Sequence, residues 1–333
     1  MDSTLRGHVG AEVAAVLRAS GRRTAVVVPA FPAAGRTTVR GVQCVGGVPV
    51  HGTSFAHDPR HPIGQSRVAD LFGHAGLGPV IELTGPEARD PIRIRQAIGA
   101  GRVVIADAQT DVDLDAILTA IGTGDGVLWV GSPGLAHALA RAHPASGKGP
   151  PMVRPGASRP LVLAGSMHPA SRAQVEILAA AIQAPPVRIA LAAAGSTGWG
   201  AVAERAGAEC RSVARRGGPI IVQSTAPVVP GGSAAAAACF AEVARSLAAD
   251  GLVDGLIATG GDTARAAAGA LGACGLRLWG EMEPGVPVGI LDGPYPLPVI
   301  TKAGGFGDQG TLVRLCKALH NPDSPTSREG LRS

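Results

Sequence analysis

Short apolar runs alternate with helix-like segments along almost the whole chain, and this alternation constrains the fold more than any other feature. The strand-like runs lie at residues 25–28, 80–83, 103–106, 127–130, 161–165, 187–191, 219–223, 255–259 and 297–301. Helical patterns lie between or beside them, at 9–20, 91–99, 112–121, 134–142, 169–182, 233–249, 263–272 and 309–319. Repeated strand–helix units build parallel sheets that helices cover on both faces. The sequence therefore predicts an α/β protein with mainly parallel sheets in three-layer α/β/α domains.

Length and breaker residues predict two domains. A chain of 333 residues of which 46% are hydrophobic can bury two cores. Residues 146–159 hold Pro, Gly, Ser and Lys with little apolar content, so we expect a linker there, between domains at 1–145 and 160–320. The polar, breaker-rich residues 321–333 predict a flexible tail. Between 36 and 61 short runs broken by glycine predict a β-hairpin excursion from the first sheet.

Composition argues against several classes of partner. The net charge is only +5, three of the 30 basic residues are Lys, and aromatic residues are rare, which disfavours a nucleic-acid surface but suits an anionic small molecule. No run approaches the ~20 apolar residues of a membrane span. The five cysteines are widely spaced, without a metal-ligand or disulfide pattern. We expect a cytoplasmic protein with no nucleic-acid or membrane partner, and a homodimer is compatible with the sequence.

Three strand-to-helix turns in the second half carry glycine. They are Gly165-Ser166-Met167-His168, Gly260-Gly261-Asp262-Thr263 and Ala303 to Asp308. Such turns gather at the carboxyl ends of parallel strands, where ligands bind, and bare backbone lets phosphate oxygens approach amide groups at helix N-termini. The hydroxyls of Ser166 and Thr263 add donors, and Asp262 or Asp308 could hold Mg²⁺. The turns predict a nucleotide-phosphate site, although each glycine could merely shape a tight turn.

The third turn also raises two alternatives. Lys302 directly precedes it and either meets a phosphate or extends into solvent at the end of a strand. Gly305 to Gly310 formally match G-x-G-x-x-G, the dinucleotide fingerprint. That fingerprint requires a following strand with an acidic residue about 20 positions on, and here one helical pattern and a polar segment follow. An NAD-dependent dehydrogenase is therefore a distant alternative, and the lack of G-x-x-x-x-G-K-[ST] disfavours a Walker-type NTPase.

Charged and hydroxyl side chains cluster near the N-terminus. Asp2, Ser3, Thr4 and Arg6 precede the first helical pattern. Arg6 could pair with a carboxylate while Asp2 and Ser3 bond hydroxyls, which would grip a polyhydroxy acid. The alternative is a segment that only caps the helix.

Four ordered segments resemble the four-carbon acid sugar kinase family. They are DSTLRGHVGAE at 2–12, PAFPAAGRTT at 29–38, GGDT at 260–263 and KAGGFG at 302–307, and they extend over nearly the whole chain. The resemblance implies an N-terminal sugar-acid-binding domain and a C-terminal nucleotide-binding domain. It further implies phosphorylation of threonate, erythronate or 3-oxo-tetronate at the 4-hydroxyl with ATP, for which we expect Mg²⁺ as the metal cofactor.

The resemblance also assigns residues. Matched motif by motif, it implies that the sugar acid contacts Asp2, Ser3 and Arg6, and that ATP contacts Ser166, Gly260, Gly261, Asp262, Thr263, Gly304 and Gly305. Relatives carry an Ala-Asp-Asp-x-Thr-Gly-Ala motif in a preceding strand–helix region, which nothing here matches. We therefore expect a truncated N-terminal domain and assign no catalytic residue. A homologue that binds nucleotide without catalysing transfer stays open as an alternative.

Overall fold

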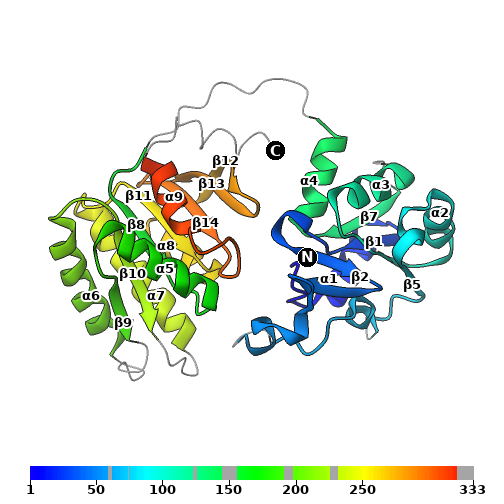
Figure 1. Cartoon of the computed structure of the whole chain (residues 1–333), viewed down its shortest axis with the longest axis horizontal. Helices are drawn as coiled ribbons and strands as arrows, with labels where there is room; N and C mark the ends of the chain where they lie inside the picture. Colours follow the sequence, from blue (N-terminus) through cyan, green and yellow to red (C-terminus); the bar gives the residue numbers. More distant parts are fainter. Residues whose placement is uncertain are drawn as a thin grey trace. The chain divides into compact units, whose positions relative to one another are not determined.

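The computed structural model describes residues 1–58, 62–73, 75–122, 126–144, 156–190, 198–225 and 232–320. The chain divides into two compact units, Met1–Lys148 and Gly149–Ser333 (Figure 1). Of the predicted linker, residues 146–155 lie outside the described residues, as does the predicted tail at 321–333. Ala157 is buried in the core of the second unit, and its amide donates to the carbonyl of Leu319 at 2.8 Å.

The first unit is built on a four-stranded parallel sheet in the order β5-β6-β1-β7. The strands are β1 (Thr24–Val28), β5 (Val80–Leu83), β6 (Val103–Ala106) and β7 (Val127–Gly131). All five residues of β1 are buried, because a central parallel strand is covered on both faces and so reads as a continuous apolar run. The prediction of parallel α/β sheets is confirmed.

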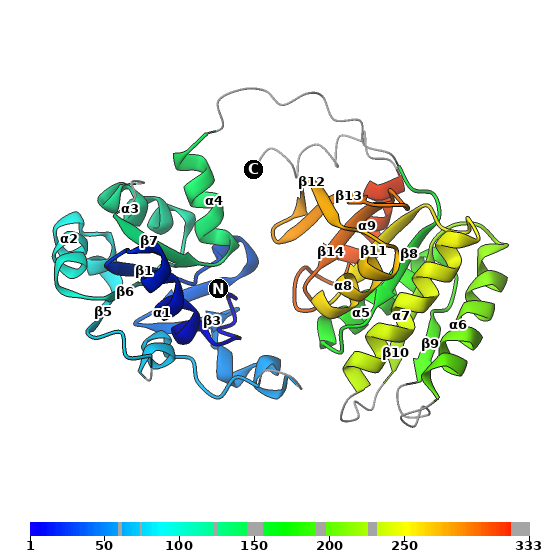
Figure 2. The same ribbon diagram turned by 180° about the vertical axis from the view of Figure 1, so that it is seen from behind.

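Helices cover both faces of this sheet, giving three layers (Figures 1 and 2). One face packs against α1 (Val9–Ser20) and the 3-10 turn η4 (Val68–Phe72). The other packs against α2 (Pro91–Ala100), α3 (Asp111–Ile121) and α4 (Pro133–Ala142). Local chemistry sets the helix ends: α1 stops at Gly21, whose φ of +68° suits glycine. Thr110 and Asp113 form a capping box at the start of α3.

The predicted hairpin excursion is a separate antiparallel sheet of three strands, β2 (Arg36–Val39), β3 (Val42–Val45) and β4 (Val48–Pro49). Asp107, at the end of β6, holds it against the parallel sheet by accepting the amides of Arg40 at 2.6 Å and Gly41 at 2.9 Å. Short 3-10 turns complete the unit: η1 (Pro32–Ala34), η2 (Val50–Gly52), η3 (Ser54–His57) and η5 (Gly85–Arg89).

The second unit has a seven-stranded mixed sheet in the order β12-β13-β14-β11-β8-β10-β9. The parallel strands are β8 (Pro160–Ala164), β9 (Val187–Ala190), β10 (Ile220–Thr225), β11 (Gly255–Thr259) and β14 (Pro298–Lys302). An antiparallel pair, β12 (Gly275–Glu283) and β13 (Val286–Asp292), extends the sheet beyond β14. The sequence reading did not include this pair.

The helices of the second unit also form two outer layers. One face of the sheet packs against α5 (Pro169–Ile182) and α9 (Thr311–His320). The other packs against α6 (Trp199–Ala214), α7 (Gly232–Ala249) and α8 (Gly261–Ala270). Helix α6 was missed because Ala203, Ala206 and Gly207 occupy much of its buried face, and such small residues give a weak apolar signal.

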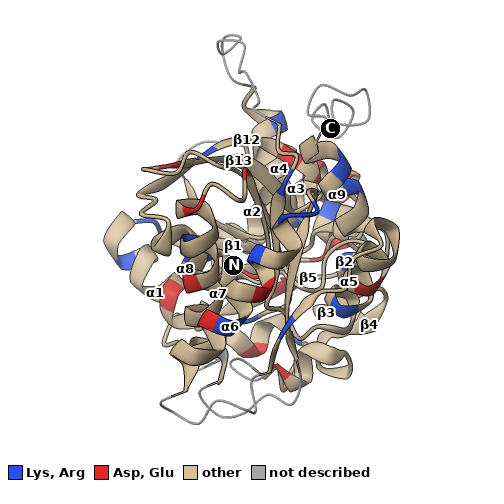
Figure 3. Ribbon diagram, turned by 90° about the vertical axis from the view of Figure 1, so that its left-hand side faces the viewer, with Lys and Arg blue, Asp and Glu red and all other residues tan. Residues whose placement is uncertain are grey.

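The surface chemistry of the described residues is mixed. Figure 3 shows basic and acidic positions interspersed along the helices of the described ranges. Within the same ranges, no helix is both long and apolar enough to cross a membrane.

Candidate functional site

The three glycine turns begin next to one another, at the carboxyl ends of three adjacent strands of the second sheet. Strands β14, β11 and β8 are adjacent and parallel, and their last residues align, with Thr259 opposite both Ala164 and Lys302. The turns that follow therefore start at the same level. Sequence reasoning expected them at a common edge, since ligands bind at the carboxyl ends of strands in open α/β sheets.

These turns approach one another so closely that side chains are excluded. A Cβ added at Gly165 would fall 1.9 Å from Thr263 Oγ1, and one added at Gly304 would fall 1.9 Å from Ser166 Oγ. Gly260 has a φ of +98°, and its Cβ would lie 3.7 Å from the amide nitrogen of Ser166. The backbone of these turns and the hydroxyls of Ser166 and Thr263 thus pack against one another at one edge of the sheet, and we call this group the cradle.

Two helices begin at this cradle. Helix α8 has Gly260 as its N-cap, so no capping side chain covers the amides of its first turn. Helix α5 has His168 as its N-cap, and the imidazole Nδ1 accepts the amide of Ala170 at 3.2 Å. Amide donors and the partial positive charge of a helix N-terminus favour an anion. Asp262, in the first turn of α8, is exposed beside it.

Lys302 lies beneath the third turn, and the expectation that it extends into solvent is wrong. The residue is 2% exposed, and its Nζ donates to the carbonyls of Ala303 at 3.0 Å, Gly304 at 3.4 Å and Phe306 at 3.0 Å. All three donors of the ammonium are used, so none remains for a phosphate. Burial lowers the pKa of Lys302 to about 8, and the charge of Glu283 opposes this shift.

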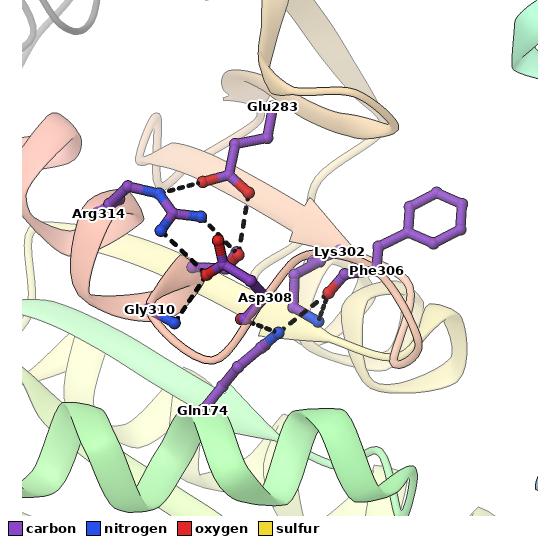
Figure 4. Close-up of polar contacts among 8 residues, drawn as sticks. Gln174, Glu283, Lys302, Phe306, Asp308, Gly310 and Arg314 are labelled. Carbon is purple, nitrogen blue, oxygen red and sulfur yellow. Dashed lines mark hydrogen bonds and ion pairs between the residues drawn. The ribbon is translucent and has the colours of Figure 1, made fainter. Parts of the chain in front are cut away.

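Two further side chains support this turn, and sequence reasoning missed both. From α5, Ser171 Oγ donates to the Gly304 carbonyl at 2.9 Å. Gln174 Nε2 donates to the carbonyls of Phe306 at 3.0 Å and Asp308 at 2.8 Å (Figure 4). Both are fully buried on the face of α5 that also carries Val175 and Leu178. Polar residues at helical spacing among buried apolar ones are the signal that could have revealed them.

Asp308, one of two carboxylates predicted near Mg²⁺, is committed to an ion pair. Its Oδ1 lies 3.0 Å from Arg314 Nη1 and accepts the Gly310 amide at 2.8 Å, and Arg314 also binds Glu283 at 2.7 Å (Figure 4). Arg314 lowers the pKa of Asp308. No described cluster of three or more His, Cys, Asp or Glu side chains could hold a metal. A Mg²⁺ ion carried by nucleotide phosphates needs only one or two carboxylates, and Asp262 fits that requirement.

The third turn also formally matches a dinucleotide fingerprint. Within the described residues, only α9 follows Gly310, and no strand. The required strand with its acidic residue is therefore not found in this part of the chain.

The predicted acid-binding residues of the first unit lie together. Arg6 Nη2 is 2.9 Å from Asp2 Oδ2, and Arg6 Nη1 is 3.2 Å from Asp58 Oδ2. The guanidinium also lies 5.6 Å from the centre of the Phe55 ring. Ser3 is buried, and its carbonyl accepts Gln43 Nε2 at 2.8 Å. The cluster is thus an ion-paired group, and sequence reasoning had not included Asp58 and Phe55.

This cluster sits at the carboxyl end of the first parallel sheet. The amino group of Met1 donates to the carbonyl of Gly131, the last residue of β7, at 2.7 Å. Arg36, the first residue of β2, is also buried near it: desolvation lowers the pKa of its guanidinium, and the charge of Asp2 opposes that shift. Both units therefore present their candidate residues where ligands of parallel sheets bind.

Comparison with known proteins agrees with this division. Residues 1–139 match the model of a sugar-binding N-terminal domain, and residues 161–312 match that of a nucleotide-binding C-terminal domain. A D-threonate kinase of Bordetella bronchiseptica is 37% identical over 331 residues, covering 96% of this chain and 76% of the relative. A D-threonate kinase of Salmonella typhimurium is 34% identical, covering 96% of this chain and 79% of the relative. A 3-oxo-tetronate kinase of Methylobacterium radiotolerans is 32% identical, covering 92% and 76%.

Solved structures share the fold. A Salmonella typhimurium protein aligns with a TM-score of 0.71 at 22% identity, covering 94% of this chain and 79% of that one. A Haemophilus influenzae protein aligns with a TM-score of 0.63 at 19% identity, covering 96% and 81%.

The relatives and the matched domain models identify a phosphotransferase, and it is built from two α/β units. Within that class, the chain belongs to the four-carbon acid sugar kinase family, as its sequence motifs predicted.

Proposed function

We propose that this chain is an ATP-dependent kinase that phosphorylates threonate, erythronate or 3-oxo-tetronate at the 4-hydroxyl. The observation that carries the proposal is the convergence of Ser166, Gly260, Thr263 and Gly304 at the ends of three adjacent parallel strands. This cradle lies in the unit that matches the nucleotide-binding model. The relatives named above are kinases of such acids, which supports the choice of substrate class.

The second unit would hold the nucleotide. The amides at the start of α8 and the hydroxyls of Ser166 and Thr263 lie close together around Gly260, where they would neutralise and align phosphate oxygens. Bound ATP with Mg²⁺ would supply the phosphoryl group, and Asp262, an exposed carboxylate in the first turn of α8, would meet the metal. Phosphoryl transfer requires mainly such positioning and charge neutralisation.

The first unit would hold the sugar acid. Arg6 is 30% exposed and already binds two carboxylates, those of Asp2 and Asp58. A substrate carboxylate has the same chemistry and can take the place of one of them on the guanidinium. The Asp2 carboxylate released in this way becomes an acceptor for a substrate hydroxyl. Ser3 is buried against Gln43, so its role is to fix the segment through its backbone.

An assay of ADP release with each of the three acids tests the proposal. We expect turnover that requires Mg²⁺ with at least one acid, and an Arg6→Lys variant should raise KM for the acid without weakening ATP binding. Arg23→Lys, a change at an exposed residue directly before β1, is the matched control. The absence of ADP release with all three acids would refute a kinase of this substrate class.

Calorimetry with ATP and Mg²⁺ separates the remaining alternatives. Binding without turnover would identify a nucleotide-binding homologue without catalysis. Binding of NAD(H) in preference to ATP would instead favour a dehydrogenase.

A further inference from the structure

A buried ammonium group organises the turn from Ala303 to Asp308. Lys302 is the last residue of β14, and its Nζ donates to three carbonyls of the turn, those of Ala303, Gly304 and Phe306, at 3.0 to 3.4 Å. A lysine ammonium has three donors and no acceptor. The turn therefore surrounds the ammonium group and accepts hydrogen bonds from all three of its donors.

Helix α5 supplies the other donors to the same turn. Ser171 Oγ binds the Gly304 carbonyl at 2.9 Å, and Gln174 Nε2 binds the carbonyls of Phe306 and Asp308 at 3.0 and 2.8 Å. Together with Lys302, these fully or almost fully buried side chains direct four carbonyls of one turn into the protein interior. Figure 4 shows Lys302 and Gln174 meeting at the Phe306 carbonyl, while the Phe306 ring points away from the cluster.

The direction of the carbonyls determines the direction of the amides. In a planar trans peptide the carbonyl and the next N–H point in opposite directions. When the carbonyls of Ala303, Gly304 and Phe306 turn towards Lys302, the N–H groups of Gly304, Gly305 and Gly307 turn away from it. The N–H groups of Gly304 and Gly307 are thereby placed on the outer side of the turn, where an anion can accept them. Gly304 also packs against Ser166, so this turn borders the cradle.

We propose that Lys302 is a positioning residue for the nucleotide: it acts as an internal cation that turns the carbonyls of the 303–308 turn inward and so aims the turn's amides at the phosphates. The inference rests on the proposed function, since it assigns the ligand of those amides. Lys302 itself does not contact the nucleotide. It acts through the backbone of the turn.

The surroundings of Lys302 indicate that the charge serves this purpose and not an ion pair. Among the described residues, Glu283 is the charged group that influences it, and Glu283 is engaged by Thr311 at 3.0 Å and Arg314 at 2.7 Å. The pKa of Lys302 is lowered by burial. A buried cation without a paired carboxylate is costly for folding, so an apolar residue would suit stability better. The ammonium is instead matched to the carbonyls of the turn.

Chemical rescue tests this role in the full chain. Lys302→Ala removes the ammonium and leaves a cavity, Lys302→Met fills the same space without charge, and Lys317→Ala removes an exposed charge on α9 as a control. We expect Lys302→Ala and Lys302→Met to weaken ATP binding at least about tenfold, the equivalent of one lost charge-assisted hydrogen bond. Lys317→Ala should bind as the parent chain does.

Methylammonium should restore ATP affinity to Lys302→Ala but not to Lys302→Met, in which the cavity is filled. Tetramethylammonium has no N–H donor and should restore neither. Circular dichroism confirms that each variant is folded. A folded Lys302→Ala that binds ATP within twofold of the parent overturns the inference. So does a loss that methylammonium does not relieve, because that result assigns Lys302 to folding alone.

Hydrogen exchange separates this inference from the proposed function. If the parent chain binds no ATP, the proposed function fails. The effect of Lys302 on the turn, its bracing role, is then measured on the chain without ligand. Amide exchange across 303–308 should be faster in Lys302→Ala than in the parent chain, and methylammonium should slow it again. Unchanged exchange in that turn overturns the bracing role.

Discussion

The contact between Gly304 and Ser166 predicts a large effect of a single added methyl group. In Gly304→Ala the new Cβ would lie 1.9 Å from Ser166 Oγ, 2.8 Å from Ser166 Cβ and 3.2 Å from His168 Cβ. Ordinary carbon contacts begin near 3.5 Å, so even the Cβ pair is short by about 0.7 Å. Rotation of the Ser166 hydroxyl removes only the first clash. The two turns must therefore move apart, and the cradle widens.

The magnitude follows from the cost of overpacking. Inserting a methyl group into a closely packed site costs about 1–3 kcal/mol. In a unit of this size such a cost lowers Tm by roughly 2–12 °C. The same displacement separates Ser166 from the Gly304 amide, so we expect the Kd for ATP to rise by about one to two orders of magnitude.

Calorimetry with ATP and thermal denaturation measure both effects. Gly269→Ala is the matched control, because it lies in α8 and no other described group lies within 4 Å of its added Cβ. That change should leave ATP affinity unaltered and raise stability by up to about 1 kcal/mol through helix propensity. If Gly304→Ala binds ATP as tightly as Gly269→Ala does, the cradle does not bind the phosphates.

Three further predictions concern charge. Because the pKa of Lys302 is lowered to about 8, the folded chain releases this proton before the unfolded chain, whose lysine pKa is about 10.4. The free energy of unfolding, measured by urea denaturation relative to Lys302→Met, should therefore rise between these pH values by up to about 3 kcal/mol. The buried thiols, whose pKa is raised, lower the free energy of unfolding as pH rises, but they do so equally in both proteins and cancel in the difference. A difference in unfolding free energy that does not change with pH would contradict the placement of Lys302. Asp113→Asn removes a buried carboxylate that accepts the amides of Gln109 and Thr110, both at 2.9 Å, and should destabilise the first unit by about 1–3 kcal/mol in thermal melts. Unaltered melting of that unit would show that the cap is dispensable. Chelation of Mg²⁺ should abolish ADP release and leave detectable ATP binding, whereas turnover in the presence of excess chelator would exclude the metal from the reaction.

Much of the fold could be predicted because its signals are local. Strand β1 reads as five consecutive buried residues, and α5 and β11 were predicted with the bounds that the structure shows. The antiparallel β12–β13 pair was not predicted because buried and exposed residues do not alternate regularly along β12. Its first four residues are exposed, and its register shifts after Leu278 and after Glu281. A bulged strand at the edge of a sheet lacks the pattern on which sequence reasoning depends.

The candidate site was predictable only in part. Glycine at a strand–helix junction is visible in sequence, which is why the turns at 165, 260 and 304 could be identified. The side chains that bind the third turn together with Lys302 could not be identified from the sequence. Ser171 and Gln174 reach the third turn across more than 130 residues of chain, and nothing local distinguishes a lysine that braces a turn from one in solvent.

The sequence by itself determined the parallel α/β class, the positions of the glycine turns and the family motifs, because each depends on residues that are neighbours in the chain. Only the tertiary structure decided that β14, β11 and β8 are adjacent, and therefore that three turns from distant segments share one cradle. It also decided that Lys302 faces the interior. The physical reason is the same for both: strand order and burial come from packing between distant segments, which local residue patterns do not encode.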